Sequence, residues 1–224
     1  EFNRRVLDEA YDATNPLLER VKFFCIFNSN LDEFFEVRVA GLMEVRRENV
    51  RERSPDGLDA GENLSAIRRR VLELVDEGYR CWREKLVPEL SRHGIEFLDP
   101  SRLTGETAAW MAEYYRDKVS PVLTPLALDP AHPFPQLLNK SLNLIVRLHG
   151  QFRGQLRRSL AVVQVPRGLP RLLPVPTDDG RRTYVFLHQL IGHHLGDLFS
   201  GMTLEGCWSF RVTRNSELYI DEEE

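Results

Sequence analysis

Three small polar residues, Asn28, Ser29 and Asn30, interrupt an apolar stretch that reads CIFNSNLDEFF over residues 25–35. A carboxamide offers a donor and an acceptor side by side, which suits the edge that adenine presents at N6 and N7. Helix capping is the alternative, because the first N–H groups of a helix need acceptors. Asn30 and Glu33 have the spacing of a capping box, with Asn in place of Ser or Thr, so a helix is expected to begin at Asn30. The residues alone leave both roles open for Asn30.

The histidines do not have the spacing of a metal site. His193 and His194 follow His188 by five and six residues, whereas paired ligands on a helix usually stand four apart, as in H-E-x-x-H. Surface or helix-end positions are therefore favoured for these three. His132, in DPAHPFP, could be oriented by a rigid proline loop, but no catalytic partner for it is evident.

The charged residues do not form a phosphate-binding fingerprint, since the sequence contains neither GxxxxGK[ST] nor GxGxxG. Asp32 and Glu33 are expected in the first turn of a helix, where acids complement the helix dipole, rather than at a metal. The acids at 221–224 could also be metal carboxylates. Most basic groups are interleaved with Glu or lie on a polar helix face, which favours solvated surfaces. They are Arg46, Arg47, Arg51, Arg53, Arg68, Arg69, Arg70, Arg157 and Arg158.

Helical periodicity dominates the first half of the chain. Asn15 and Pro16 are typical of a helix start, with Asn as cap and Pro in the first turn. The polar stretch at 47–63 is rich in Gly, Pro and Asp and is expected to be a mobile loop. A long amphipathic helix should follow over residues 64–90, with a kink at Pro88.

The second half begins with a stretch that is rich in proline. Residues 120–139 contain five prolines, which favours an ordered, extended connection. Short helices are expected before and after it, over residues 106–119 and 188–199. The strand-like runs of β-branched and apolar residues are 142–148, 160–165, 172–175, 184–187, 210–213 and 218–220.

These elements together predict an α+β protein. An all-α N-terminal helical domain is expected over residues 1–100, followed over residues 101–224 by an α/β head domain with a mixed sheet.

The composition is typical of a soluble globular protein: of 224 residues, 42% are hydrophobic and 29% are charged. The net charge of −4 gives no support for a nucleic-acid partner, which would favour a strongly basic face. No apolar run approaches the roughly 20 residues that cross a bilayer. Cys25, Cys81 and Cys207 form neither a metal spacing nor a disulfide framework, so a cytoplasmic location is expected.

Four long segments of the chain resemble the bacterial polyphosphate kinase family, and they occur in the family's order. They are NPLLERVKFFCIFNSNLDEFFEVRVAGL, SPVLTPLALDPAHPFPQLLNKSLNL, LAVVQVPRGLPRLLPVP and CWSFRVTRNSELYIDEEE. The family's usual opening, RELSWLxFN, survives only as Phe2-Asn3. The resemblance implies an N-terminal domain and a head domain, with the family's two C-terminal phospholipase-D-like domains absent from this sequence.

The resemblance also implies an activity: reversible transfer of the γ-phosphate of ATP to inorganic polyphosphate through a phosphohistidine, assisted by Mg²⁺. Such a covalent intermediate splits one difficult transfer into two steps. In the family the reacting histidine, the metal carboxylates and most phosphate-binding arginines belong to the C-terminal domains. We therefore expect no catalysis by this chain alone, and no catalytic role for its histidines, which are His93, His132, His149, His188, His193 and His194.

One ligand position carries over by resemblance. The family's last Asn before LDEF contacts the nucleotide, and the matching residue here is Asn30. The head domain is expected to support a homodimer, and peripheral membrane association of the parent enzyme stays open. The alternatives are an assembly module with no ligand affinity and, less favoured, a nucleic-acid binder that uses the arginines after Val45.

Overall fold

The computed structural model describes residues 1–48, 53–129, 131, 133–152, 155–177 and 180–215, without the side chains of 151–157. The chain divides into two compact units. One comprises Glu1–Arg92 with the segment from Thr213 onward, and the other comprises His93–Val212. The first contains only helices among its described elements, and the second contains both sheets, so the expected α+β class is confirmed.

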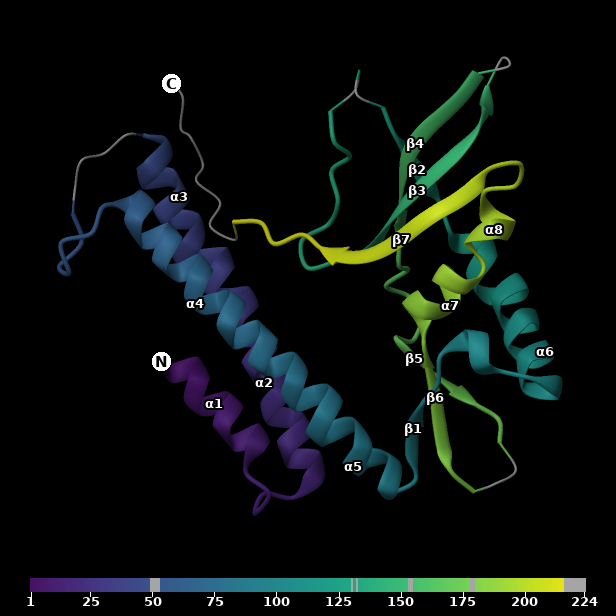
Figure 1. Ribbon diagram of the computed structural model, residues 1–224, viewed down its shortest axis with the longest axis horizontal. Coiled ribbons are helices and arrows are strands. Elements are labelled where there is room, and N and C mark those ends of the chain that lie inside the picture. Colours follow the sequence, from purple (N-terminus) through teal and green to yellow (C-terminus); the bar gives the residue numbers. More distant parts are fainter. Residues whose placement is uncertain (49–52, 130, 132, 153–154, 178–179, 216–224) are drawn as a thin grey trace. The chain divides into compact units, whose positions relative to one another are not determined.

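The helical unit is built around two long helical segments that lie side by side, with a short helix packed against them (Figure 1). The short helix is α1, and each long segment consists of two α-helices joined by a π-helical turn. The elements are α1 (Phe2–Tyr11), α2 (Leu17–Phe34), the turn Phe35–Val39, α3 (Ala40–Arg47), α4 (Ala60–Arg80), the turn Cys81–Leu86 and α5 (Val87–Arg92).

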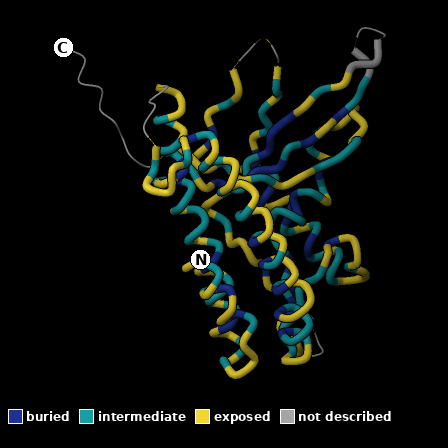
Figure 2. The backbone as a smooth tube through the Cα atoms, turned by 60° about the vertical axis from the view of Figure 1, so that its left-hand side comes forward, coloured by how far each residue is buried: buried dark blue, intermediate teal, exposed yellow. Residues whose placement is uncertain are grey.

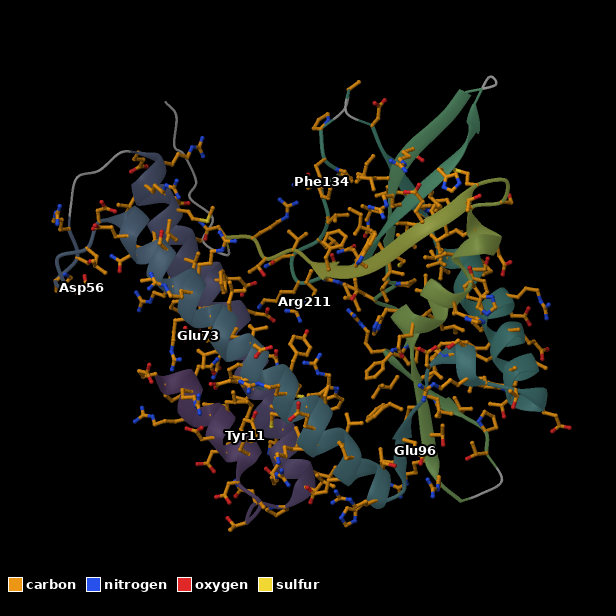
Figure 3. All side chains as sticks on the ribbon, viewed as in Figure 1. Tyr11, Asp56, Glu73, Glu96, Phe134 and Arg211 are labelled. Carbon is orange, nitrogen blue, oxygen red and sulfur yellow. The ribbon has the colours of Figure 1, made fainter. Side chains whose placement is uncertain are left out.

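Apolar side chains between these helices form the core of the unit, and Figure 2 shows exposed residues along the outer sides of the helices. Phe27 is 1% exposed and lies against Gly78 of α4, where a Cβ atom would come within 2.8 Å of the Phe27 ring. Tyr11, labelled in Figure 3, ties α1 to α4 by donating its hydroxyl to the Glu77 carbonyl at 2.9 Å. The buried core residues are Leu7, Ala10, Phe27, Leu74, Cys81 and Leu86.

The expectation that a helix begins at Asn30 is wrong. Helix α2 runs without a break from Leu17 to Phe34, so Asn30 lies in its interior, while Asp32 and Glu33 lie in its last turn. The capping-box spacing of Asn30 and Glu33 gave a wrong prediction because the carboxamides of Asn28 and Asn30 bond to other groups than the N–H groups of a helix start. Asn28 Nδ2 donates to the Phe24 carbonyl of the preceding turn at 2.8 Å, and Asn30 bonds to a residue of α1.

Two other helix starts also differ from expectation. Asn15 does not cap α2, because its side chain donates to the Glu9 carbonyl and carboxylate. Helix α4 begins at Ala60, inside the stretch expected to be a loop. Its start is a capping box, in which the Asp59 side chain accepts from the Glu62 N–H at 2.8 Å and Glu62 accepts from the Asp59 N–H at 2.9 Å.

The head unit, His93–Val212, contains two sheets. The first is mixed: β1 (Ile95–Phe97) is parallel to β6 (Arg182–Phe186), which is antiparallel to β5 (Leu172–Val175). The second is antiparallel, in the order β2-β4-β3-β7. Its strands are β2 (Pro125–Leu128), β3 (Leu142–Phe152), β4 (Gln155–Gln164) and β7 (Thr203–Arg211).

Helices cover one face of the antiparallel sheet. They are α6 (Gly105–Tyr114) with the π-helical turn Tyr115–Val119, α7 (Leu187–His193) and α8 (Leu195–Leu198). Alternate residues of β3, namely Leu144, Val146 and Leu148, point into the resulting core, and each is at most 2% exposed. This alternation is typical of a sheet with one buried face.

The proline-rich stretch is more regular than expected, because Pro125–Leu128 pairs with β4 as an edge strand. Proline is tolerated at the first residue of an edge strand, where its missing N–H leaves no ladder bond unmade. The helix expected over residues 188–199 is two short helices, α7 and α8. The expected strand at 218–220 lies outside the described residues.

Candidate functional site

A cavity of about 320 Å³ lies in the helical unit, between the first residues of α1, the end of α2 and the middle of α4. This volume is at the lower end of the range for small-molecule sites, roughly 300–1,000 Å³. The polar side chains on its wall are Asn3, Asn30, Arg70 and Glu1. The rest of the wall is apolar and consists of Phe2, Leu31, Phe34, Ile67, Val71 and Leu74.

Helix α2 positions Asn30 at this cavity. Asn30, Leu31 and Phe34 lie on one face because residues three and four apart share a side of a helix. The Asn30 side chain is half-buried, and its Nδ2 donates to Asn3 Oδ1 of α1 at 3.1 Å. Asn3 Nδ2 in turn donates to the backbone carbonyl of Phe27 at 3.0 Å. The carboxamide predicted to contact a ligand therefore lines a cavity and is held by a second carboxamide.

Arg70 is the cationic group on the opposite wall, which α4 supplies. Its guanidinium lies 3.1 Å from Glu73 Oε2 and 3.3 Å from Glu1 Oε1. The hydrogen bond to Glu73 raises the pKa of Arg70, so the group stays charged. A planar base between apolar walls, with a carboxamide on one side and a cation on the other, is the kind of ligand that these groups could hold.

Two aromatic side chains lie at the junction of α2 and the π-helical turn Phe35–Val39. Phe34 lines the cavity just described, whereas Phe35 lines a neighbouring cavity of about 430 Å³ in the same unit. The two rings meet edge to face, with centroids 6.1 Å apart. A π-helical turn often lies beside a functional site, because the extra residue redirects the side chains that follow.

Sequence reasoning missed Asn3 and Arg70 as members of the site. The sequence pattern places Arg70 with its neighbours on a solvated helix face. Asn3 stands out only as part of the family's opening. Neither residue is close to Asn30 in sequence, so no local spacing could have brought the three together.

The histidines that are described lie away from this cavity, and four of them, His149, His188, His193 and His194, contact neighbouring side chains. The His194 ring stacks on Tyr115 with centroids 4.2 Å apart, and its Nδ1 lies 3.1 Å from Asp197 Oδ2. His149 Nδ1 lies 3.2 Å from Glu205 Oε1, although not in the direction of a hydrogen bond. Among the residues that the structure describes, no three His, Cys, Asp or Glu side chains are arranged to hold a metal ion. His132 and the acids at 221–224 lie outside those residues.

Glu205 lies between basic side chains in the head unit. Arg147 Nε forms an ion pair with Glu205 Oε2 at 2.9 Å, and Glu205 Oε1 accepts a hydrogen bond from Arg158 Nε at 3.1 Å. The Arg147 guanidinium lies 5.2 Å from the centre of the Trp208 ring. Among the arginines after Val45, Arg53 donates to the Gly57 carbonyl at 2.8 Å, and Arg51 lies outside the described residues.

Comparison with known proteins decides the family. The model of the polyphosphate kinase N-terminal domain matches residues 1–98, and that of the polyphosphate kinase middle domain matches residues 106–224. The chain belongs to the polyphosphate kinase family. Among curated members, it is 45% identical over its whole length to the polyphosphate kinase of Pseudomonas aeruginosa and 43% identical to that of Neisseria gonorrhoeae. It covers 33% of each of these relatives.

A solved polyphosphate kinase has the same fold over nearly the whole chain. The crystal structure of polyphosphate kinase from Porphyromonas gingivalis matches 98% of this chain with a TM-score of 0.84 and 31% sequence identity, and 32% of that protein is covered. The chain thus spans about a third of the length of the polyphosphate kinases that it matches. Within the described residues, each helix is too short or too polar to serve as a membrane span.

Proposed function

We propose that this chain is the nucleotide-contacting and dimer-forming part of an enzyme that reversibly transfers the γ-phosphate of ATP to inorganic polyphosphate. The relatives are named polyphosphate kinase, and the chain matches a third of their length. The transfer would proceed through a phosphohistidine with Mg²⁺, on residues beyond this chain. The chain by itself is then expected to be inactive.

The observation that carries the nucleotide contact is the cavity around Asn30. The residue that the family resemblance assigned to the nucleotide lines it, together with apolar side chains and the Arg70 guanidinium. A purine base could lie between apolar side chains such as Phe34 and Val71, where stacking and burial stabilise it, and meet the Asn30 carboxamide at its polar edge.

The proposed dimer surface is the outer face of the antiparallel sheet in the head unit. Leu160 and Trp208 lie on the face opposite the core and are 40% and 50% exposed. Val162 lies on the same face but is fully buried, so the open part of this face is the part around Leu160 and Trp208. A sheet face that is open to water normally carries polar residues at alternate positions, so these exposed apolar side chains favour a covered face.

The alternative is an assembly module with no nucleotide affinity of its own. Calorimetric titration with Mg·ATP of the original chain and of Asn30→Ala separates the two functions. Circular dichroism checks the fold of both proteins. Binding that weakens in Asn30→Ala with the helix content unchanged supports the nucleotide contact. If neither the original chain nor the variant binds Mg·ATP, the result favours the assembly module. Turnover by the chain in an assay with ATP and polyphosphate would contradict its expected inactivity.

A further inference from the structure

Two hydrogen bonds determine the orientation of the Asn30 carboxamide. Asn3 Nδ2 donates to the backbone oxygen of Phe27 at 3.0 Å. A carbonyl oxygen can only accept, so this contact identifies the amino end of the Asn3 side chain. Asn3 Oδ1 then faces Asn30 and accepts from Asn30 Nδ2 at 3.1 Å. The chain of bonds would not survive a flip of either amide, because two oxygens or two amino groups would then face each other.

This orientation leaves Asn30 Oδ1 for a ligand. Asn3 uses one proton of Asn30 Nδ2, and within the part of the chain that is described no donor bonds Asn30 Oδ1. Asn30 is half-buried and lines the cavity, so an acceptor is presented there beside the second proton of the same amide. Arg70, on the other wall, can only donate, and its guanidinium is already paired with Glu1 and Glu73.

We propose that Asn3 is a positioning residue, which holds the Asn30 oxygen toward the cavity so that the site selects a purine carrying an amino donor at position 6. This inference rests on the proposed function, in which the cavity takes the base. Adenine presents its 6-amino group as a donor next to a ring nitrogen that accepts, and so matches both ends of the oriented carboxamide. Guanine presents an oxygen at position 6, which would oppose the lone pairs of Asn30 Oδ1.

The test compares Mg·ATP with the Mg²⁺ complex of purine riboside triphosphate, which lacks only the 6-amino group. Calorimetry on the 224-residue chain should give about three- to tenfold tighter binding of ATP, the typical value of one hydrogen bond. Asn3→Ala frees the Asn30 amide to turn, and the ratio of the two affinities should fall below about two. Ser29→Ala, at an exposed neighbour on α2, is the matched control and should keep the full ratio.

The ratio separates positioning from structural support. If Asn3→Ala weakens both ligands equally and leaves the ratio at its original value, Asn3 only supports the fold and the inference is overturned. If the original chain binds both ligands equally while Asn30→Ala weakens both, the nucleotide contact stands and the selection by Asn3 and Asn30 falls. If no nucleotide binds, or Asn30→Ala changes nothing, the proposed function falls and the inference with it. Circular dichroism on each variant verifies that the helices are intact.

Discussion

At the scale of single residues, close packing in the helical unit depends on one glycine. Gly78 lies in α4, where glycine costs about 1 kcal/mol relative to alanine, yet the Phe27 ring occupies the space that a Cβ atom would need. Phe27 also supplies the carbonyl that orients Asn3. The same contact therefore serves both the core and the candidate site.

We expect Gly78→Ala to destabilise the chain by about 1–2 kcal/mol, because the strain of overpacking exceeds the gain in helix propensity. Urea denaturation followed by circular dichroism measures the change in the free energy of unfolding. Gly41→Ala is the control: a Cβ atom there meets nothing within 4 Å, so that variant should be stabilised by about 0.5–1 kcal/mol. Equal effects of the two substitutions would contradict the packing argument.

His188 should make stability depend on pH. Burial lowers its pKa, and the nearby charge of Arg171 adds to the shift. The unfolded chain then binds more protons at this site below a pH of about 6.5, so stability falls as the pH decreases through that value. The loss of unfolding free energy between pH 7.5 and pH 5.5 should be smaller in His188→Gln than in the original chain. An identical loss in both would exclude His188 as its source.

At the scale of elements, one buried arginine joins three helices. Arg20 of α2 is 3% exposed; its Nε donates to the Ala10 carbonyl of α1 at 3.0 Å, and its guanidinium lies 2.7 Å from Glu89 of α5. A charge this far from water is tolerated only when its hydrogen bonds are made. The placement of α1 against α2, and with it that of Asn3 beside Asn30, depends on this contact.

Arg20→Ala should therefore cost about 2–4 kcal/mol, since it removes a buried side chain with its ion pair to the partly exposed Glu89 and leaves the Ala10 carbonyl without its donor. Denaturation in urea gives the value. Arg5→Ala, an exposed arginine of α1, should change stability by less than about 0.5 kcal/mol. A loss below about 1 kcal/mol for Arg20→Ala would mean that water replaces its contacts.

At the scale of the whole molecule, the proposed dimer can be tested by placing a charge on the outer face of the antiparallel sheet. Leu160→Glu should lower the dimer affinity at least tenfold, because association would have to remove water from a carboxylate, and Arg147, opposite residue 160 on β3, is already paired with Glu205. Sedimentation velocity over a range of concentrations detects this change. Leu72→Glu is the control, since Leu72 is 59% exposed on α4 of the helical unit and should leave association unchanged. A chain that is monomeric before any substitution would refute the proposed surface.

The sequence by itself determined most elements of this protein, because periodicity and turn residues are local. The apolar spacing of the long helix and the strand-like runs within β3 and β4 could be predicted, and so could the division into helical and α/β parts. Asn30 could be selected as a ligand position only through resemblance to a family. The predicted helix start at that residue failed because a capping pattern cannot reveal whether a tertiary partner is present.

Only the tertiary structure decided which residues lie around Asn30. Its partner Asn3 lies 27 residues away, and Arg70 of the opposite wall lies 40 residues beyond Asn30. The packing of α1 and α4 against α2 brings the three residues to one cavity. A helix can continue through Asn28 and Asn30 because their amides are satisfied there, one by the preceding turn and the other by a neighbouring helix. Hydrogen bonds between residues so distant in sequence depend on how helices pack, which no short pattern of residues encodes.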